Sequence, residues 1–367
     1  DLYPKFTSQY TDQTVAANSV IVVCGDKSKV VSNSDMWETS TNYQTYQTQT
    51  TGFDGEGQIT SAITYVTSEN NPKVYWVTGH GEASESDLST NFSDAINKNN
   101  VEISDLALMT DDIPEDAEEL VIMSPTTDFS EDEANKVITY LENGGKLLMF
   151  TSYTGTDMPN LDSILENYGV KRSSGIVVET DSQHYYPQMP YYLLPNIQSD
   201  DITTEVKSNY ILMPVAQAIQ KLDSYRDTIT IKSLLTTTED AYIENDPENS
   251  TWSKSADSET GAFDLGVSIT ETVDDKETQI IYFSSASMLS SQIDQAISGA
   301  NSKLAATALT SMCDVEQTVV IPSKSTSYTN LVFTQGAVNT WSIITIAGIP
   351  LVLVVIGVMI WMKRRKQ

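Results

Sequence analysis

Short apolar runs alternate with segments of helical periodicity along the first half of the chain. The runs at 74–78, 101–108, 119–124 and 146–151 have the length and the β-branched content of buried strands. Between and after them, apolar residues recur at helical spacing over 88–96, 134–141 and 161–168. Strands that alternate with helices through short turns are typical of an α/β fold, in which helices cover both faces of a parallel sheet. We therefore predict a Rossmann- or flavodoxin-like domain.

The boundaries of one helix are especially clear. Ser130 to Glu133 forms the pattern of a capping box, and a buried stripe of Ala134, Val137 and Leu141 follows it. Asn143 and the two glycines after it end the helix before the fourth strand.

The remaining chain is less regular. The N-terminal runs 19–24 and 29–32 predict a hairpin, 33–55 is polar and predicts a loop, and the apolar spacing over 59–66 predicts a short helix with Ile63 on its buried face. In the second half, further strands are expected at 211–215, 229–235, 263–269 and 279–283, with a polar excursion over 236–262. The Tyr- and Pro-rich segment 181–195 excludes a regular helix, and 300–312 predicts the last helix of the domain.

The C-terminus has the pattern of a membrane anchor. Residues 341–362 carry no charge and would span about 33 Å as a helix. Trp341 and Trp361 mark its two ends, and Lys363, Arg364, Arg365 and Lys366 follow at once. A buried core helix is the alternative, but it leaves the basic cluster unexplained. Because such a cluster stays in the cytoplasm, we expect a single span in this chain, with residues 1–340 outside the cell membrane.

Charge sharpens this picture. Before residue 341 the chain carries 17 basic and 50 acidic residues, a formal charge of −33. Nucleic acid and anionic lipid headgroups need Lys/Arg surfaces, so neither is an expected partner. The two cysteines, Cys24 and Cys313, are too few and too far apart for a disulfide framework, and Cys24 lies in an apolar run that predicts a buried thiol.

Candidate chemistry is confined to the ends of predicted strands, where open α/β sheets bind ligands. These ends are Thr78–Glu82, Ser124–Phe129, Thr151–Gly155, Thr236–Asp240 and Ser284–Leu289. The residues that we single out there, as ligand-binding or loop-structuring, are Thr78, Gly79, His80, Gly81, Glu82, Ser124 and Asp128. Small polar residues also cap and turn at strand ends, and this simpler interpretation is favoured.

His80 and Glu82 are the closest pair with acid–base or metal-binding chemistry. A hydrogen bond that fixes their loop is favoured over either role, since the other histidine, His184, is distant in sequence. The chain has no GxSxG elbow, no GxGxxG fingerprint and no P-loop. We therefore predict no enzyme activity, no cofactor, no metal and no ATP hydrolysis by this chain.

Several longer segments resemble one family, the gliding-motility-type auxiliary components of ABC transporters (GldG-like proteins). The resemblance rests on VYWVTGHGE (74–82), on IPEDAEELVIMSP (113–125) and on YLENGGKLLMF (140–150). It continues through GIVVE (175–179) and IKSLLTTTEDAY (231–242). The segment 284–292 departs from the family pattern because it lacks an acidic residue and a phenylalanine, which puts a polar role for that loop in doubt.

The resemblance implies a membrane-anchored, extracytoplasmic subunit that works with a separate permease and a cytoplasmic ATPase. It implies a sheet related to that of class I glutamine amidotransferases, without their nucleophile. The expected domains are 1–50, the tail of a truncated N-terminal α/β domain; 51–312, the Rossmann-like domain with β-rich excursions; 313–340, a stalk; 341–362, the transmembrane helix; and 363–367, a basic tail. The chain begins at Asp1 without a visible signal peptide, which favours a missing N-terminal segment.

Three functions remain open from the sequence. The first is a non-enzymatic auxiliary subunit of an ABC transport system, which contacts the permease through the C-terminal helix and the stalk. The second is a surface-anchored binding module that holds a glycan or a small polar ligand in the strand-end crevice. The third is a degenerate hydrolase that uses His80 and Glu82.

Overall fold

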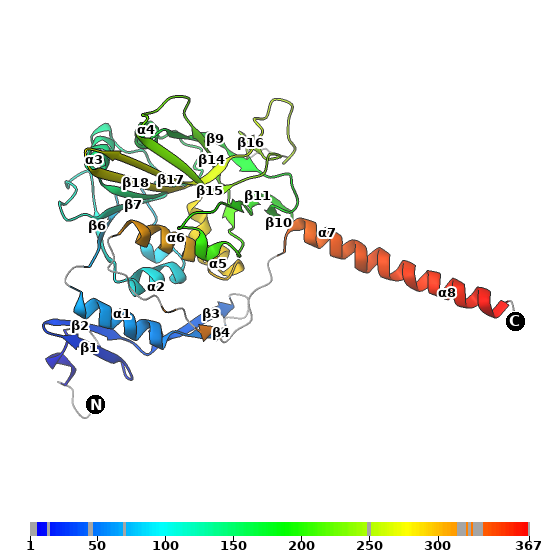
Figure 1. Cartoon of the computed structure of the whole chain (residues 1–367), viewed down its shortest axis with the longest axis horizontal. Coiled ribbons are helices and arrows are strands. Elements are labelled where there is room, and N and C mark those ends of the chain that lie inside the picture. The colour runs from blue at the N-terminus through cyan, green and yellow to red at the C-terminus, as the bar shows by residue number, and fades with distance from the viewer. Residues whose placement is uncertain are drawn as a thin grey trace.

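The computed structural model describes residues 6–12, 15–42, 47–68, 71–247, 251–313, 321, 324–325 and 333–365. They form a layered α/β body from which one long helix projects (Figure 1). The described strands form sheets of eleven, three, three and two strands.

The largest sheet has a parallel half with the strand order β6-β5-β7-β8-β18. Its members are β5 (Lys73–Val77), β6 (Glu102–Leu106), β7 (Glu119–Met123), β8 (Lys146–Phe150) and β18 (Lys276–Phe283). The four strands expected in the first half of the chain are therefore confirmed, and they are parallel.

An antiparallel half continues the same sheet from β18 through β17, β14, β9 and β16, with β15 and β12 branching from β17. Its members are β9 (Val170–Val178), β12 (Asn196–Ile197), β14 (Gln217–Lys221), β15 (Ile229–Thr236), β16 (Tyr242–Glu244) and β17 (Asp264–Val273). The β-rich excursions thus extend the sheet itself, and the whole is a mixed sheet.

Helices cover both faces of this sheet (Figure 1). Helices α3 (Glu131–Glu142) and α4 (Pro159–Asn167) lie on one face; α2 (Thr90–Lys98), α5 (Ser291–Ala296) and α6 (Ala300–Met312) lie on the other. Strand β7 shows why both layers are needed, since all five of its residues are buried. Leu120 and Ile122 belong to the α3–α4 core, and Val121 and Met123 belong to the α2–α6 core.

An N-terminal layer lies beneath α2 in Figure 1. Helix α1 (Gly55–Thr67) packs on the hairpin of β1 (Val20–Cys24) and β2 (Lys27–Val31), which confirms the predicted hairpin and helix. An ion pair of 2.7 Å between Lys98 Nζ and Asp54 Oδ1 ties this layer to α2. The side chain of Asn100 adds two hydrogen bonds to Ser61, each of 3.0 Å.

Three sequence-based expectations about this layer were wrong. The predicted loop 33–55 contains the antiparallel strands β3 (Trp37–Asn42) and β4 (Gln47–Phe53), which join β19 (Lys324–Ser325). These strands are rich in threonine and lack an apolar alternation, so the period-2 signal was absent although β-branched residues favour strands. Ile63 is 49% exposed, because α1 turns Ala62 and Val66 toward the hairpin. Cys24 is exposed at the end of a hairpin that is open on one face, while Cys313 is buried.

The second half also differs from the pattern in places. Only Met213–Pro214 (β13) of the expected strand 211–215 is a strand, and the segment 170–178 forms β9 although its middle is polar. The Tyr- and Pro-rich segment forms the hairpin of β10 (Tyr185–Tyr186) and β11 (Met189–Leu193). This agrees with the prediction that the segment is not a regular helix. The short 3-10 helices are η1 (Thr7–Gln9), η2 (Ser34–Met36), η3 (Glu85–Asp87), η4 (Thr204–Val206) and η5 (Ala286–Leu289).

The C-terminal helix starts on the β10–β11 hairpin. Helix α7 (Gln335–Ile343) continues through a π-helical turn, η6 (Ile344–Gly348), into α8 (Ile349–Arg365). Pro350 lacks a backbone N–H and its ring crowds the preceding turn, which is the physical reason for the wider turn there. The N–H of Gly336 donates to Ser182 O at 2.7 Å, and the N–H of Gln188 donates to Gln335 Oε1 at 2.9 Å. The helix is therefore fixed to the body at its first turn.

A buried carboxylate holds the lower helical layer together. Asp294 accepts hydrogen bonds from Ser89 Oγ at 2.7 Å, Asn91 Nδ2 at 2.8 Å, and Ser302 N and Oγ at 2.9 and 2.7 Å. Asp294 itself lies on α5, and its donors lie on α2, at the N-cap of α2 and on α6, so one side chain joins three helices.

We predict that Asp294→Ala destabilises the protein by roughly 3 kcal/mol, because it leaves several buried donors without an acceptor. The measurement is equilibrium urea unfolding, with the exposed Asp223→Ala as the matched control, expected within about 0.5 kcal/mol of wild type. Equal stability of the two variants would contradict this role.

Candidate functional site

The parallel half of the sheet has a topological switch point. Strand β5 lies between β6 and β7, so the chain leaves β5 to one side and returns to the other. In open α/β sheets the loops that follow two adjacent strands run to opposite faces of the sheet at such a point. Ligands bind in the crevice between these loops, outside the carboxyl ends of the strands. Here the loop after β5 carries Thr78 to Glu82, and the loop after β7 carries Ser124 to Asp128. The structure thus brings both predicted segments to one place.

The loop after β5 is tied tightly to the loop after β7. The carbonyl oxygen of His80 accepts hydrogen bonds from Thr126 N and Thr127 N at 2.9 and 3.0 Å, and from both threonine hydroxyls at 3.2 and 3.1 Å. Gly81 has a φ of +77°, and a Cβ there would lie 2.1 Å from Thr126 Oγ1. Glycine at 81 is therefore required by both its conformation and the close approach. Gly79 also has a positive φ, of +123°, and Thr78 N donates to Leu106 O at 3.0 Å.

The His80 ring lies between two carboxylates. Its Nδ1 is 3.1 Å from Glu82 Oε1, and its Nε2 is 3.3 Å from Glu133. All three side chains are at most 5% exposed. Phe129 covers the ring, with the two centroids 4.3 Å apart. Both ring nitrogens therefore face carboxylate oxygens.

Glu133 has two tasks in this arrangement. It completes the capping box of α3, since its carboxylate accepts from Ser130 N at 2.9 Å and from Ser130 Oγ at 2.7 Å. Burial raises the pKa of Glu133, but the Ser130 hydrogen bonds and the nearby His80 together outweigh burial and hold the pKa below its ordinary value. The capping box was predicted from the sequence; the contact with His80 was not, because it joins residues 53 positions apart.

Asp128 and Ser124 take part in neighbouring elements. Asp128 accepts from the N–H groups of Asn160 and Leu161 at 3.1 and 3.0 Å, and so caps α4, whose own N-cap residue has no side-chain hydrogen bond. Ser124 has a φ of +54°, and its hydroxyl lies 2.9 Å from Ser152 Oγ after β8. In the part of the chain that the structure describes, no group of three His, Cys, Asp or Glu side chains is arranged to hold a metal ion.

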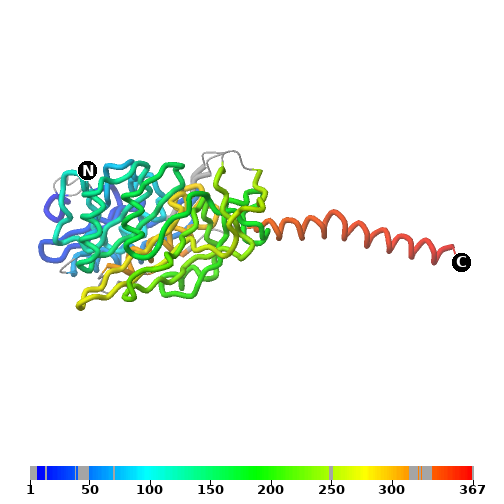
Figure 2. Tube along the Cα trace, turned by 90° about the horizontal axis from the view of Figure 1, so that it is seen from above, coloured from blue at the N-terminus to red at the C-terminus, as the bar shows by residue number. Residues whose placement is uncertain are grey.

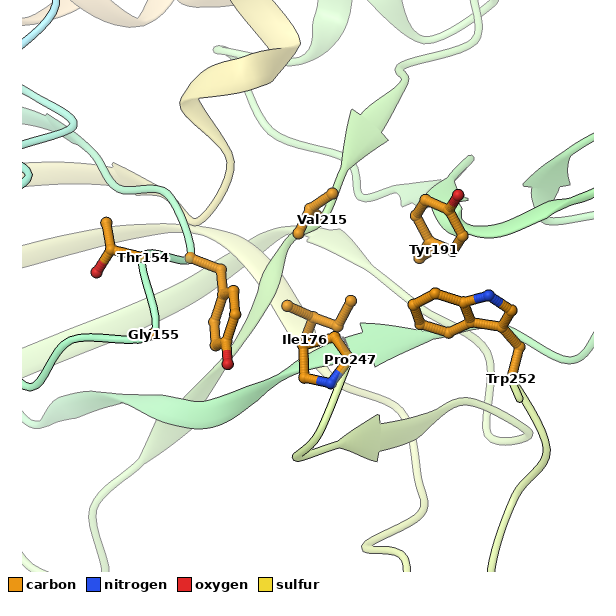
Figure 3. A pocket seen from close by; sticks show the side chains of 8 residues that line it. Thr154, Gly155, Ile176, Tyr191, Val215, Pro247 and Trp252 are labelled. Carbon is orange, nitrogen blue, oxygen red and sulfur yellow. The ribbon is translucent and has the colours of Figure 1, made fainter. Parts of the chain in front are cut away.

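A separate hollow of about 410 Å³ opens beyond the carboxyl end of β8 (Figure 3). Its lining contains three aromatic side chains, three aliphatic ones and the turn after β8: Tyr153, Thr154, Gly155, Ile176, Tyr191, Val215, Pro247 and Trp252. Tyr191 and Trp252 pack against each other, with centroids 4.4 Å apart, and form one wall. None of the described side chains in this lining is charged.

Two residues of this hollow have strained backbones. Val215 and Trp252 both have a φ of +54°, which β-branched and bulky residues rarely adopt. Such a conformation costs about 1–3 kcal/mol per residue. Of the lining, the strand end Thr151–Gly155 named in the sequence analysis contains Tyr153, Thr154 and Gly155. The Tyr-rich segment 181–195 was the available signal for Tyr191.

The C-terminal helix of 31 residues, Gln335–Arg365, is the one helix in the described ranges that is long and apolar enough to cross a membrane. Trp341 and Trp361 are 61% and 58% exposed on it. The Arg365 guanidinium lies 5.2 Å from the Trp361 ring centre, next to Lys363 and Arg364. Lys366 lies outside the described residues.

The protein is therefore a mixed α/β domain with one candidate membrane anchor at its C-terminus. Its family follows from a family model described as an ABC-type uncharacterized transport system, which matches residues 71–311, more than half of the chain. The chain belongs to this family of auxiliary components of ABC transporters. A comparison with curated proteins finds no match.

Solved structures show only distant likeness. The N-terminal domain of mmIFT52 is 15% identical, with a TM-score of 0.48, over 65% of this chain and 96% of that one. A putative thua-like protein from Parabacteroides merdae is 13% identical, with a TM-score of 0.37, over 68% and 93%. The exo-β-1,4-mannosidase Op5Man5 from Opitutaceae bacterium strain TAV5 is 10% identical, with a TM-score of 0.34, over 69% and 37%.

We predict that Glu133→Gln reduces the loss of stability in acid. Because the folded-state pKa of Glu133 is lowered, its contribution is complete above the ordinary glutamate value of about 4.3 and is lost as the pH falls through the folded-state pKa. The free energy of unfolding of wild type should therefore fall more steeply below about pH 4.3 than that of the variant. Urea unfolding as a function of pH measures this difference.

The matched control is Glu131→Gln, an exposed glutamate in the same first turn of α3. It should keep the wild-type slope in acid. Identical slopes for wild type and Glu133→Gln would show that the His80 and Ser130 contacts do not stabilise the ionised carboxylate.

Proposed function

We propose that this protein is a non-catalytic, extracytoplasmic auxiliary subunit, anchored by its C-terminal helix, that pairs with a separate permease and a cytoplasmic ATPase. The family match over residues 71–311 carries the proposal, and the 31-residue helix supports it. The sequence has no P-loop, so another chain must hydrolyse ATP. The likeness to GldG-like proteins in particular is part of this proposal.

The proposed orientation follows from charge. Lys363, Arg364, Arg365 and Lys366 directly follow the span, and such clusters stay in the cytoplasm. The acidic body, with its formal charge of −33, then lies outside.

The proposed absence of catalysis rests on the switch point. The only ring with acid–base chemistry there is His80, and both its nitrogens are already directed to buried carboxylates. A catalytic base must reach a substrate proton, and this ring is 5% exposed. We infer that Thr78, Gly79, His80, Gly81, Glu82 and Ser124 structure the loops and that Asp128 caps α4.

We also infer a flavodoxin-like ancestry for the parallel half of the sheet. Its order, β6-β5-β7-β8-β18, corresponds to 2-1-3-4-5 when the five strands are numbered along the chain. The antiparallel half is then an elaboration added beside the fifth strand.

The fixed start of α7 suits a subunit that contacts a permease through its helix. The hydrogen bonds of Gly336 and Gln335 to the loop before β10 and to the β10–β11 turn hold helix and body together. The apolar side chains of α8 are exposed on every side, so they are available to lipid and to another membrane helix.

Cys24 provides a test of orientation, because it is exposed and Cys313 is buried. In intact cells we predict that a membrane-impermeant maleimide labels wild type. Replacing Lys363–Lys366 with Glu should lower labelling, since these residues carry the positive-inside signal. Mass spectrometry of the labelled chain measures the fraction modified.

Cys24→Ala is the control and should remove the label, since burial raises the pKa of the Cys313 thiol and keeps it unreactive. Labelling of wild type only after the cells are opened would place the body inside and refute the orientation.

Co-purification tests the partners. From its native membrane in mild detergent, the full-length protein should recover an ATPase and a multi-span membrane protein. A variant in which residues 349–362 are scrambled keeps the length, composition and basic tail of the anchor. It should remain in the membrane fraction but recover several-fold less ATPase, because specific helix packing is lost.

Recovery of no ATPase by wild type would refute the proposed role. If the scrambled variant recovers as much ATPase as wild type, the proposed partners stand, but they contact the body and not α8.

A further inference from the structure

The hollow beyond β8 lies at the end of the body that faces the membrane. Strands β10, β11 and β16 lie at the end from which α7 emerges (Figures 1 and 2). Tyr191 of the hollow belongs to β11, and Pro247 follows β16 closely in sequence. The hydrogen bonds of α7 to Ser182 and Gln188 fix the helix beside this same hairpin.

The distance to the membrane is short. Six residues, 335–340, separate the start of α7 from Trp341, where the apolar segment begins. Because they are helical, they span only about 9 Å. Tryptophan prefers the headgroup level, so this end of the body lies close to the lipid headgroups.

The lining of the hollow selects a neutral ligand. It has no cation to hold a phosphate or carboxylate, and the body carries a charge of −33, which repels anions. Among the described residues, its lining has no carboxylate to hold an ammonium group or a metal ion. Nucleotides and phospholipid headgroups therefore do not fit.

The lining does offer flat apolar surfaces with hydroxyl groups beside them. Thr154 and Gly155, which follow Tyr153 directly in the chain, lie on one side, and Trp252 with Tyr191 lies on the other (Figure 3). Among the described residues, neither the Tyr153 nor the Tyr191 hydroxyl makes a hydrogen bond to another group. Sugar rings present C–H faces to aromatic rings and hydroxyls to polar groups at the edge, and the volume of about 410 Å³ is in the range of small-ligand sites.

We propose that this hollow binds a neutral pyranose ring at the outer surface of the membrane, between Tyr153 and the Trp252–Tyr191 wall. The ring is either the headgroup of a neutral glycolipid or a unit of a soluble glycan. The proposal uses the membrane placement given above and is independent of the ATPase and permease.

The test uses the full chain in phosphatidylcholine nanodiscs and saturation-transfer NMR of three soluble probes, maltotriose, cellotriose and chitotriose. At least one should bind, and Trp252→Ala and Tyr153→Ala should each weaken that binding by about tenfold or more, because each removes one aromatic face. Tyr210→Ala, an exposed aromatic residue outside the lining, is the matched control and should leave binding unchanged. Circular dichroism establishes that each variant is folded, and Tyr153→Phe, which removes only a hydroxyl, should have a smaller effect.

A second arm distinguishes the two sources of the sugar. Nanodiscs that contain diglucosyl diacylglycerol should compete with the soluble probe and raise its apparent Kd if the ligand is a glycolipid headgroup. An unchanged Kd, with probe binding still sensitive to Trp252→Ala, assigns the site to a soluble glycan. Absence of binding by all three probes, or equal binding by wild type and both alanine variants, would overturn the proposal. The soluble-probe arm also works in detergent, so a wrong membrane orientation or a missing ATPase does not produce a false failure.

Discussion

The central parallel strands β7 and β8 are apolar on both faces, and this constraint shapes the rest of the molecule. All five residues of β7 and four of the five residues of β8 are buried, as are three of the five residues of β5. Burial of one aliphatic side chain contributes about 1.5–3 kcal/mol, so neither face can be left to water. Helices α3 and α4 cover one face, and α2, α5 and α6 cover the other. The loops at the carboxyl ends of the strands are consequently held between two helical layers.

Buried polar groups fix those loops in place. His80 between Glu82 and Glu133, Asp128 on the start of α4, and Asp294 between α2 and α6 each satisfy donors that would otherwise be stranded. At the switch point, where many α/β proteins bind a ligand, the side chains of His80, Glu82 and Glu133 are buried against one another. The aromatic hollow lies further along the same edge, beyond the carboxyl end of β8.

The start of the C-terminal helix connects this edge to the membrane. Gly336 approaches the loop before β10 so closely that a Cβ would overlap the Gln183 side chain at 1.5 Å. A helix docked in this way fixes the position of the body relative to the membrane that the helix would cross. A flexible linker would leave that position free. The short distance between that docking point and Trp341 keeps the aromatic hollow near the headgroups.

Elements with a local signal could be predicted from the amino-acid sequence. The strands β5 to β8, the capping box at Ser130, the hairpin β1–β2 and the apolar helix after Trp341 all follow from periodicity and end signals within a few residues. Features that depend on contacts between distant segments could not be predicted in this way. The Thr-rich strands β3 and β4 pair with each other, although neither has the apolar alternation from which a strand is predicted. The second carboxylate beside His80 belongs to Glu133 of helix α3, 53 positions away in the chain. The hollow combines residues from 153 to 252. Such contacts cannot be predicted from the spacing of residues along the sequence, because the topology of the sheet sets how far apart the partners lie in the chain.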